Sequence, residues 1–127
     1  MKIVSTVARY LLGILFTVFG LNGFLNFIPP MPMPPMAGQF FGVLLASHYV
    51  VPIFLIELVC GLLFLANHYV PLALTLIAPV IFNILVFHVL MNLSGIVPGA
   101  IAIICWFLVF SSVRRAFDGI LRDRPTA

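Results

Sequence analysis

Four long apolar runs, separated by short turn-forming segments, dominate the sequence. They cover residues 4–28, 50–66, 71–91 and 96–113. At a rise of about 1.5 Å per residue, helices of roughly 17 to 25 residues are about 25 to 37 Å long, enough to cross a hydrocarbon core of about 30 Å with modest tilt or local thinning. The pattern therefore predicts four transmembrane helices, at about residues 5–28, 50–66, 71–91 and 96–113.

Prolines and small polar residues mark the ends of these runs. Pro29 and Pro30 cannot continue the first helix, and residues 67–71 allow only a tight turn between the second helix and the third. Residues 92–95 turn the chain again before the fourth helix. Because short connections place consecutive helices side by side and antiparallel, the sequence predicts an all-α four-helix bundle in a single domain, residues 1–127.

Small and soft residues within the runs indicate how the helices pack. Gly13 and Gly20 lie seven residues apart on about one face of the first helix, which predicts a close approach by another helix. Cys60 and Cys105 fall at similar depths in different helices, so a contact between them is conceivable. Apolar packing is the favoured role for both thiols, and the chain has no CxxC motif for thiol redox chemistry.

The segment between the first two helices, residues 29–49, contains no charged residue. Five of the ten prolines and three methionines lie within residues 29–36, a composition that favours an extended, polyproline-like path. A solvated loop of this length normally carries charge, so we expect this Pro/Met-rich outer loop to follow the membrane surface or fold over the mouth of the bundle. Residues 37–47 are predicted to form a short interfacial helix. A connector and a lid over a ligand site both remain open.

Composition and charge place the chain in a membrane. Hydrophobic residues make up 64% and charged residues 7%, with a mean hydropathy of +1.29, too little polar surface for a soluble globule. Lys2 and Arg9 flank the first run and four arginines follow the last, but residues 29–49 and 92–95 contain no Lys or Arg. This bias predicts a multi-pass protein with both termini in the cytoplasm. The net charge of +3 fits anionic lipid, and no nucleic-acid partner is predicted.

Glu57 is the strongest indication of function, because it is a lone carboxylate inside an apolar run. A charged side chain at the centre of a membrane helix costs roughly 2.5 to 3.5 kcal/mol, so it persists only if it is protonated, paired or beside water. A functional Glu57 would relay protons, balance a ligand's charge or accept a hydrogen bond. The alternative is a protonated structural acid bonded to Asn22 or Asn83.

Depth places several polar side chains in one layer. Counting along helices of alternating direction puts Asn22, Glu57 and Asn83 about 9, 10 and 12 Å below the outer boundary, and His88 at about 5 Å. A shared network would satisfy these groups together, and a ligand cavity is predicted between the first three helices. His88 lies about 140° around the helix from Asn83, so a water, a ligand or a neighbouring subunit of an oligomer could bridge the gap.

The remaining histidines do not add a metal site. His48 and His68 fall at opposite boundaries of the membrane, where ordinary interface roles are favoured for both. Three histidines on different sides cannot form one metal site, so no bound metal is predicted.

Several motifs, in their order and spacing, resemble the DoxX-like family of small four-helix membrane proteins. The resemblance covers about residues 4–115. It is carried by Ala8-Arg9-Tyr10-Leu11-Leu12-Gly13, Phe19-Gly20-Leu21-Asn22-Gly23-Phe24, the Pro/Met-rich outer loop, Glu57 with Cys60-Gly61-Leu62-Leu63, Val70-Pro71-Leu72-Ala73-Leu74, Ala78-Pro79, Asn83-Ile84 and Phe87-His88.

The resemblance implies a bundle in a bacterial-type inner membrane, with Asn22, Glu57, Asn83 and His88 as its characteristic polar positions. Some members of the family are described as subunits of quinone-linked oxidoreductases, and others act in the assembly of membrane complexes. The chain has no haem-ligating pair, flavin fingerprint or iron–sulfur cysteine set, hence no self-sufficient catalytic motif. A redox role would therefore need a diffusible quinone or a partner subunit that carries the cofactor.

Three functions are compatible with the polar layer and with the family resemblance. In the first, a redox-associated subunit holds a quinone-like or other amphiphilic ligand at the polar layer. In the second, a non-catalytic structural or assembly subunit uses the same layer to stabilise its own fold. A small transporter is the least favoured function, because small multidrug resistance proteins are similar in size but place their carboxylate in the first helix.

Overall fold

The computed structural model describes residues 2–124, and every regular element in this range is helical. The predicted all-α class is therefore confirmed for these residues, whereas residues 1 and 125–127 of the predicted domain lie outside them. The elements are α1 (Lys2–Leu25), α2 (Pro35–Ala46), α3 (Val51–Ala66), α4 (Val70–Met91) and α5 (Val97–Val113), with 3₁₀ turns η1 (Leu93–Gly95) and η2 (Arg114–Phe117).

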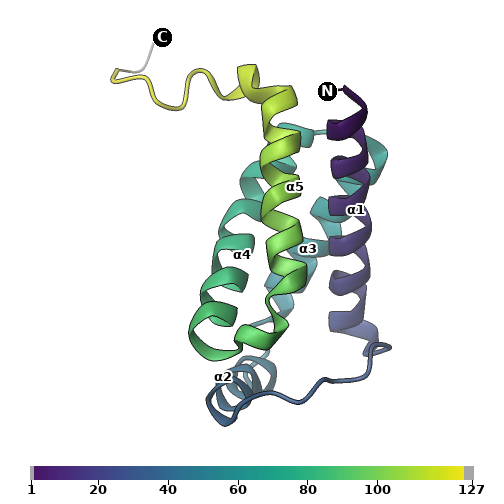
Figure 1. Ribbon diagram of the computed structural model, residues 1–127, viewed down its shortest axis with the longest axis vertical. Coiled ribbons are helices and arrows are strands. Elements are labelled where there is room, and N and C mark those ends of the chain that lie inside the picture. The colour runs from purple at the N-terminus through teal and green to yellow at the C-terminus, as the bar shows by residue number, and fades with distance from the viewer. Residues whose placement is uncertain (1, 125–127) are drawn as a thin grey trace.

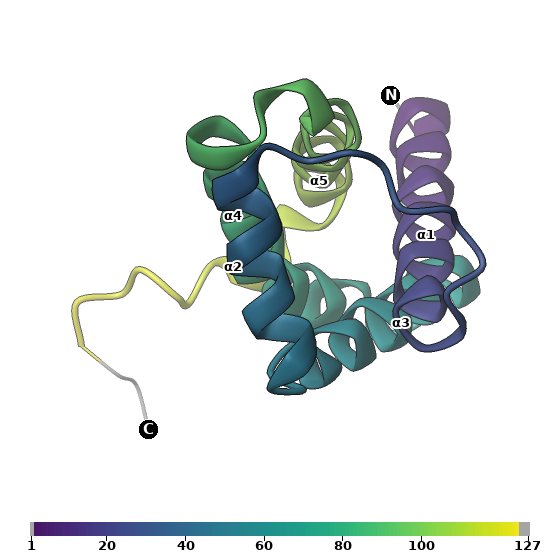
Figure 2. The ribbon, with the colours of Figure 1, turned by 90° about the horizontal axis from the view of Figure 1, so that it is seen from below.

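Four of the helices, α1, α3, α4 and α5, pack side by side around a common core (Figure 1). The helix α1 packs most extensively against α3 and then against α5, while α4 packs against α3 and α5. Viewed along the bundle, α1 and α4 therefore occupy opposite corners (Figure 2). The start of α1 and the end of α5 lie at one end of the bundle, and α2 lies at the other (Figure 1).

Local chemistry explains where the helices begin and end. Four helices have a proline in the first turn, where the backbone N–H that proline lacks would have no partner within the helix. The first helix ends at Leu25 and not at the predicted residue 28, because Asn26 adopts a left-handed φ of 52°. The side chain of Asn22 then accepts a hydrogen bond from the backbone N–H of Ile28 at 2.7 Å. The side chain of Asn22 thus caps α1, and the helix ends before Pro29 and Pro30.

The end of the bundle away from the start of α1 carries α2 (Figure 1). This helix begins at Pro35, two residues before the predicted start, because a proline fits the first turn. It turns 88° from α3, and its Phe40 ring lies 5.9 Å from the ring of Phe87 on α4. Figure 2 shows the Pro/Met-rich outer loop and α2 running across the end of the bundle.

Three helices in the described range are long and apolar enough to cross a membrane: α1, α4, and α5 together with η2. The helix α3 has 16 residues, about 24 Å at the standard rise. It qualifies only when α2 is joined to it across the bend, which would make a fourth, broken span. The chain thus has the helices of a membrane protein, and the predicted span at residues 50–66 is the shortest of the four.

Glycines allow a close contact between α1 and α3. A Cβ placed on Gly13 would lie 2.6 Å from the side chain of Leu65, and one placed on Gly20 would lie 2.7 Å from the backbone nitrogen of Leu58. Gly13 faces Leu65 and the later Gly20 faces the earlier Leu58, so the two helices are antiparallel. The close approach predicted from Gly13 and Gly20 is confirmed.

Candidate functional site

Glu57 lies in the interior of the bundle. It belongs to the buried stripe of α3, with Cys60, Gly61 and Phe64 on the same face. Only 6% of the residue is exposed, and its buried Oε2 atom has no hydrogen-bond partner within residues 2–124. A buried carboxyl oxygen without a donor costs free energy that water would otherwise have offset. The Oε2 atom of Glu57 therefore lacks the hydrogen-bond donor that would offset this cost.

The other three predicted site residues bond to nearby backbone atoms. Asn22 is half-buried and caps the end of α1 through Ile28. Asn83 is exposed and donates to the carbonyl of Pro79 at 2.8 Å, and His88 Nδ1 lies 3.2 Å from the carbonyl oxygen of Asn92. Among the described residues, no hydrogen bond joins any of these three side chains to Glu57. The structural alternative, in which Asn22 or Asn83 satisfies the carboxyl group, is therefore not what the hydrogen bonds show.

Thr17 is a further polar group that sequence reasoning missed. Its buried Oγ1 also lacks a hydrogen-bond partner in the described part of the chain. It faces α3 at Gly61, one helical turn from Glu57, and a Cβ on Gly61 would lie 2.5 Å from both the nitrogen and the Oγ1 of Thr17. The unpartnered hydroxyl of Thr17 thus lies on the face of α1 that packs against α3, the helix that carries Glu57. The available signal was Gly61, which lies four residues after Glu57 and marks where a polar residue of another helix can come close.

A small polar cluster surrounds His88 in the last turn of α4. The side chain of Asn92 is buried and accepts a hydrogen bond from the Ser94 hydroxyl at 3.1 Å. The backbone N–H of Asn92 donates to the carbonyl of His88 at 3.1 Å. The sequence indicated Asn92 and Ser94 as turn residues only. Their bonds show that His88 belongs to the connection between α4 and α5 and not to the environment of Glu57.

The hollows on the surface of residues 2–124 include the following two. One is an apolar groove of about 480 Å³ between α4 and α5, lined by Pro79 and Trp106 among others. The indole N–H of Trp106 donates to the carbonyl of Leu74 at 3.0 Å, which joins the same two helices. The other is a polar cavity of about 510 Å³ near the start of α1. Neither is lined by Glu57, so the predicted ligand cavity beside Glu57 stays a prediction.

The remaining candidate groups are the two thiols and the side chains that could bind a metal ion. Cys60 and Cys105 are buried free thiols in the core. Within residues 2–124, no group of three His, Cys, Asp or Glu side chains is placed to hold a metal ion.

Arg9 is the second residue that sequence reasoning missed, since it was interpreted only as a marker of topology. Its guanidinium reaches across to α3 and donates to the carbonyl of Phe64. That carbonyl lies in the last turn of α3, where Asn67 adopts a left-handed φ of 56° and caps the helix. A cation at a helix C-terminus is favourably placed against the helix dipole.

Comparison with models of protein families, with curated proteins and with solved structures found no significant match to this chain.

Proposed function

We propose that this chain is a DoxX-like membrane protein that binds a quinone-like or other amphiphilic ligand through Glu57. The observation that carries the proposal is the buried, unpartnered Oε2 of Glu57. A neutral carboxylic acid can donate its O–H to a quinone carbonyl, and it can accept a hydrogen bond from a quinol hydroxyl. The ligand would satisfy a group that the described chain leaves unsatisfied.

The bonding of the neighbouring polar groups supports a ligand over a purely structural acid. Asn22 and Asn83 are already bonded to backbone atoms, so neither has to turn toward Glu57 for the fold to be stable. The orphan hydroxyl of Thr17 on the facing helix supplies a second polar contact for the same head group. The apolar part of the ligand would lie along the Phe- and Leu-rich helix faces, as in most small-molecule sites.

The outer end of the bundle offers a route to this site. Glu57 lies six residues from the start of α3 at Val51, about 9 Å along the helix. The Pro/Met-rich outer loop and α2 cross this end (Figure 2), and Met31 and Met36 are exposed there. Methionine side chains adapt to ligands of different shape, so this segment acts in the proposal as the entrance.

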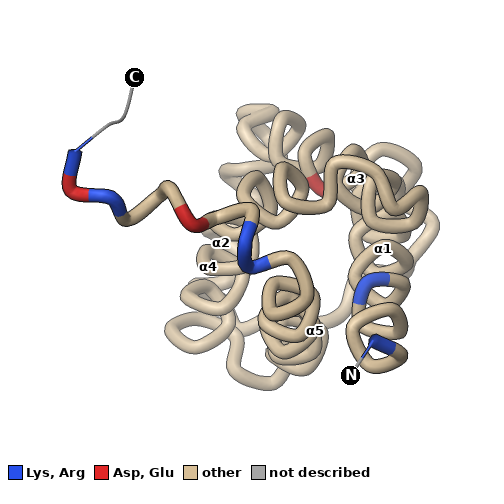
Figure 3. Tube along the Cα trace, turned by 90° about the horizontal axis from the view of Figure 1, so that it is seen from above, with Lys and Arg blue, Asp and Glu red and all other residues tan. Residues whose placement is uncertain are grey.

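The proposed setting is a bacterial-type inner membrane with both termini in the cytoplasm. The positive-inside bias of Lys2, Arg9 and the arginines after α5 supports this orientation. Both basic groups lie at one end of the bundle (Figure 3). Any electron transfer to the ligand would come from a partner subunit, because no cofactor motif occurs in the chain.

Binding of a short-chain benzoquinone, ubiquinone-1, to the purified protein in lipid nanodiscs tests the proposal by titration calorimetry. Removing a buried hydrogen-bonding group costs about 1 to 3 kcal/mol, so Glu57→Leu should weaken binding about 5- to 150-fold. Thr17→Val should weaken it less, and His68→Ala at the opposite turn should leave it unchanged. Equal affinity of the wild type and Glu57→Leu would refute the role of Glu57.

One observation favours the alternative, a non-catalytic structural or assembly subunit: neither described hollow is lined by Glu57. In that case ubiquinone-1 should bind neither the wild type nor Glu57→Leu, and native mass spectrometry should find membrane protein partners but no quinone. The two functions thus differ in the wild type, which binds ubiquinone-1 in the first and does not bind it in the second.

A further inference from the structure

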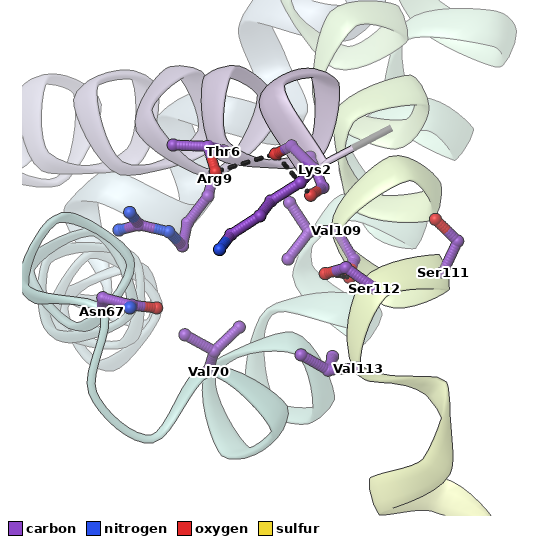
Figure 4. Close-up of a pocket in the computed structure, with 10 residues that line it drawn as sticks. Lys2, Thr6, Arg9, Asn67, Val70, Val109, Ser111, Ser112 and Val113 are labelled. Atoms are coloured by element: carbon purple, nitrogen blue, oxygen red, sulfur yellow. Dashed lines mark hydrogen bonds between the residues drawn. The ribbon is translucent and has the colours of Figure 1, made fainter.

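The polar cavity at the end of the bundle opposite α2 is independent of Glu57. It measures about 510 Å³ and lies between the start of α1, the turn into α4 and the end of α5. The residues that line it are Lys2, Ser5, Thr6, Arg9, Asn67, Val70, Val109, Ser111, Ser112 and Val113. In Figure 4 the ammonium group of Lys2 points into the hollow, and the guanidinium of Arg9 lies at its edge, above Asn67 and turned toward the end of α3.

The charged side chains that line this cavity are all basic. Two cations line it and no acidic residue does. The chain has only three acidic residues: Glu57 is buried in α3, and Asp118 and Asp123 lie in the tail (Figure 3). Within residues 2–124 no ion pair neutralises Lys2 or Arg9. Two uncompensated cations beside one hollow attract an anion.

The hydrogen-bond donors of the cavity can be counted. Ser5 and Thr6 donate their hydroxyl protons to the carbonyl of Lys2, at 3.1 and 2.9 Å. Ser111 donates to the carbonyl of Leu108 at 2.7 Å, and Ser112 donates to the carbonyl of Val109 at 2.6 Å. These hydroxyls therefore have no proton left for a ligand. The side-chain donors that remain are the ammonium of Lys2, the amide of Asn67 and the N–H groups of Arg9 not used on Phe64.

The contact with Phe64 makes Arg9 a preorganised donor. Its guanidinium lies 4.5 Å above the ring of Tyr10 and also bonds to the end of α3, so its position is held from two sides. A fixed guanidinium loses little side-chain freedom on binding, and its planar fork matches the oxygens of a phosphate group. Lys2 adds a second charge without a rigid geometry.

We propose that this cavity binds the phosphate group of an anionic ligand, and that in the membrane this ligand is the headgroup of an anionic phospholipid. Basic pockets between membrane helices on the cytoplasmic side recognise such headgroups, and the positive-inside rule assigns this end to that side. Exposed apolar residues of α1 next to the cavity, Ile3 and Val7, lie where acyl chains would run. The further arginines of η2 raise the local concentration of anionic lipid.

Native mass spectrometry in mild detergent tests the proposal with phosphatidylglycerol and phosphatidylcholine of identical chains. The wild type should retain phosphatidylglycerol preferentially. Lys2→Gln with Arg9→Gln should lower this retention about tenfold or more, as expected for the loss of charge-assisted phosphate contacts. The matched control, Arg114→Gln with Arg115→Gln, removes the same charge outside the cavity lining and should lower it about twofold at most.

Two further arms keep the result interpretable. Lys2→Gln alone removes no hydrogen bond that the described side chains make, so it should weaken retention without affecting folding even if Arg9→Gln destabilises α3. In the second arm, inorganic phosphate is added as a competitor. Displacement of the lipid would mean that the free anion is a sufficient ligand. The phosphate site would then stand, with the free anion in place of the lipid as its occupant. Equal retention of the two lipids with no binding of phosphate, or equal losses in the two double variants, would overturn the proposal.

Discussion

Gly20→Ala is the substitution whose effect follows most directly from the packing of α1 on α3. A Cβ at Gly20 would lie 2.7 Å from the nitrogen and 2.9 Å from the Cα of Leu58, where ordinary contacts begin at 3.4 Å. Both obstructing atoms belong to the backbone, so no side-chain rotation relieves the overlap. The two helices would have to separate locally by several tenths of an ångström.

The expected cost is the difference between two opposing effects. Overpacking a tight contact typically costs about 1 to 3 kcal/mol, whereas replacing glycine by alanine within a helix gains about 1 kcal/mol. Gly38→Ala is the matched control, because nothing lies within 4 Å of a Cβ at this position in α2. The free energy of unfolding of Gly20→Ala should therefore fall about 1 to 3 kcal/mol below that of Gly38→Ala.

Reversible unfolding in mixed micelles, titrated with a denaturing detergent and followed by circular dichroism, measures this difference. Gly13→Ala provides a graded comparison. Its close contacts at 2.6 and 2.7 Å are with the side chain of Leu65, which can rotate away, so its loss should be smaller. Equal stability of Gly20→Ala and Gly38→Ala would refute the close contact between α1 and α3.

Three further outcomes are expected. Cysteine labels in residues 29–49 should react from outside the cell and labels in residues 114–124 from inside; the opposite pattern would reverse the orientation. Glu57→Gln should keep wild-type stability in thermal melts if the buried acid is neutral, and marked destabilisation by Gln but not by Asp would indicate an ionised, paired carboxylate. Trp106→Phe should lower the free energy of unfolding by about 0.5 to 1.5 kcal/mol through loss of its bond to Leu74, and an unchanged stability would show that this bond contributes nothing.

Local rules account for what the sequence by itself determined. Apolar runs, prolines in first turns and small polar turns act within a few residues, so the helical class and the positions of α3, α4 and α5 could be predicted to within one residue. The rarity of charge in an apolar run singled out Glu57 as a residue with a special environment, and the structure shows that only 6% of it is exposed. The spacing of Gly13 and Gly20 predicted a close contact with another helix, because residues seven apart lie on about one face of a helix.

Only the tertiary structure decided which groups bond to one another. Counting depth along a helix gives a height but not a rotation, and successive residues differ by about 100° around the axis. Asn83 could therefore share a layer with Glu57 and still bond to Pro79 on its own helix. Arg9 needed the C-terminus of α3 beside it before its role was visible. Long-range pairs depend on how whole helices turn and approach, and this orientation is set by the packing of all four.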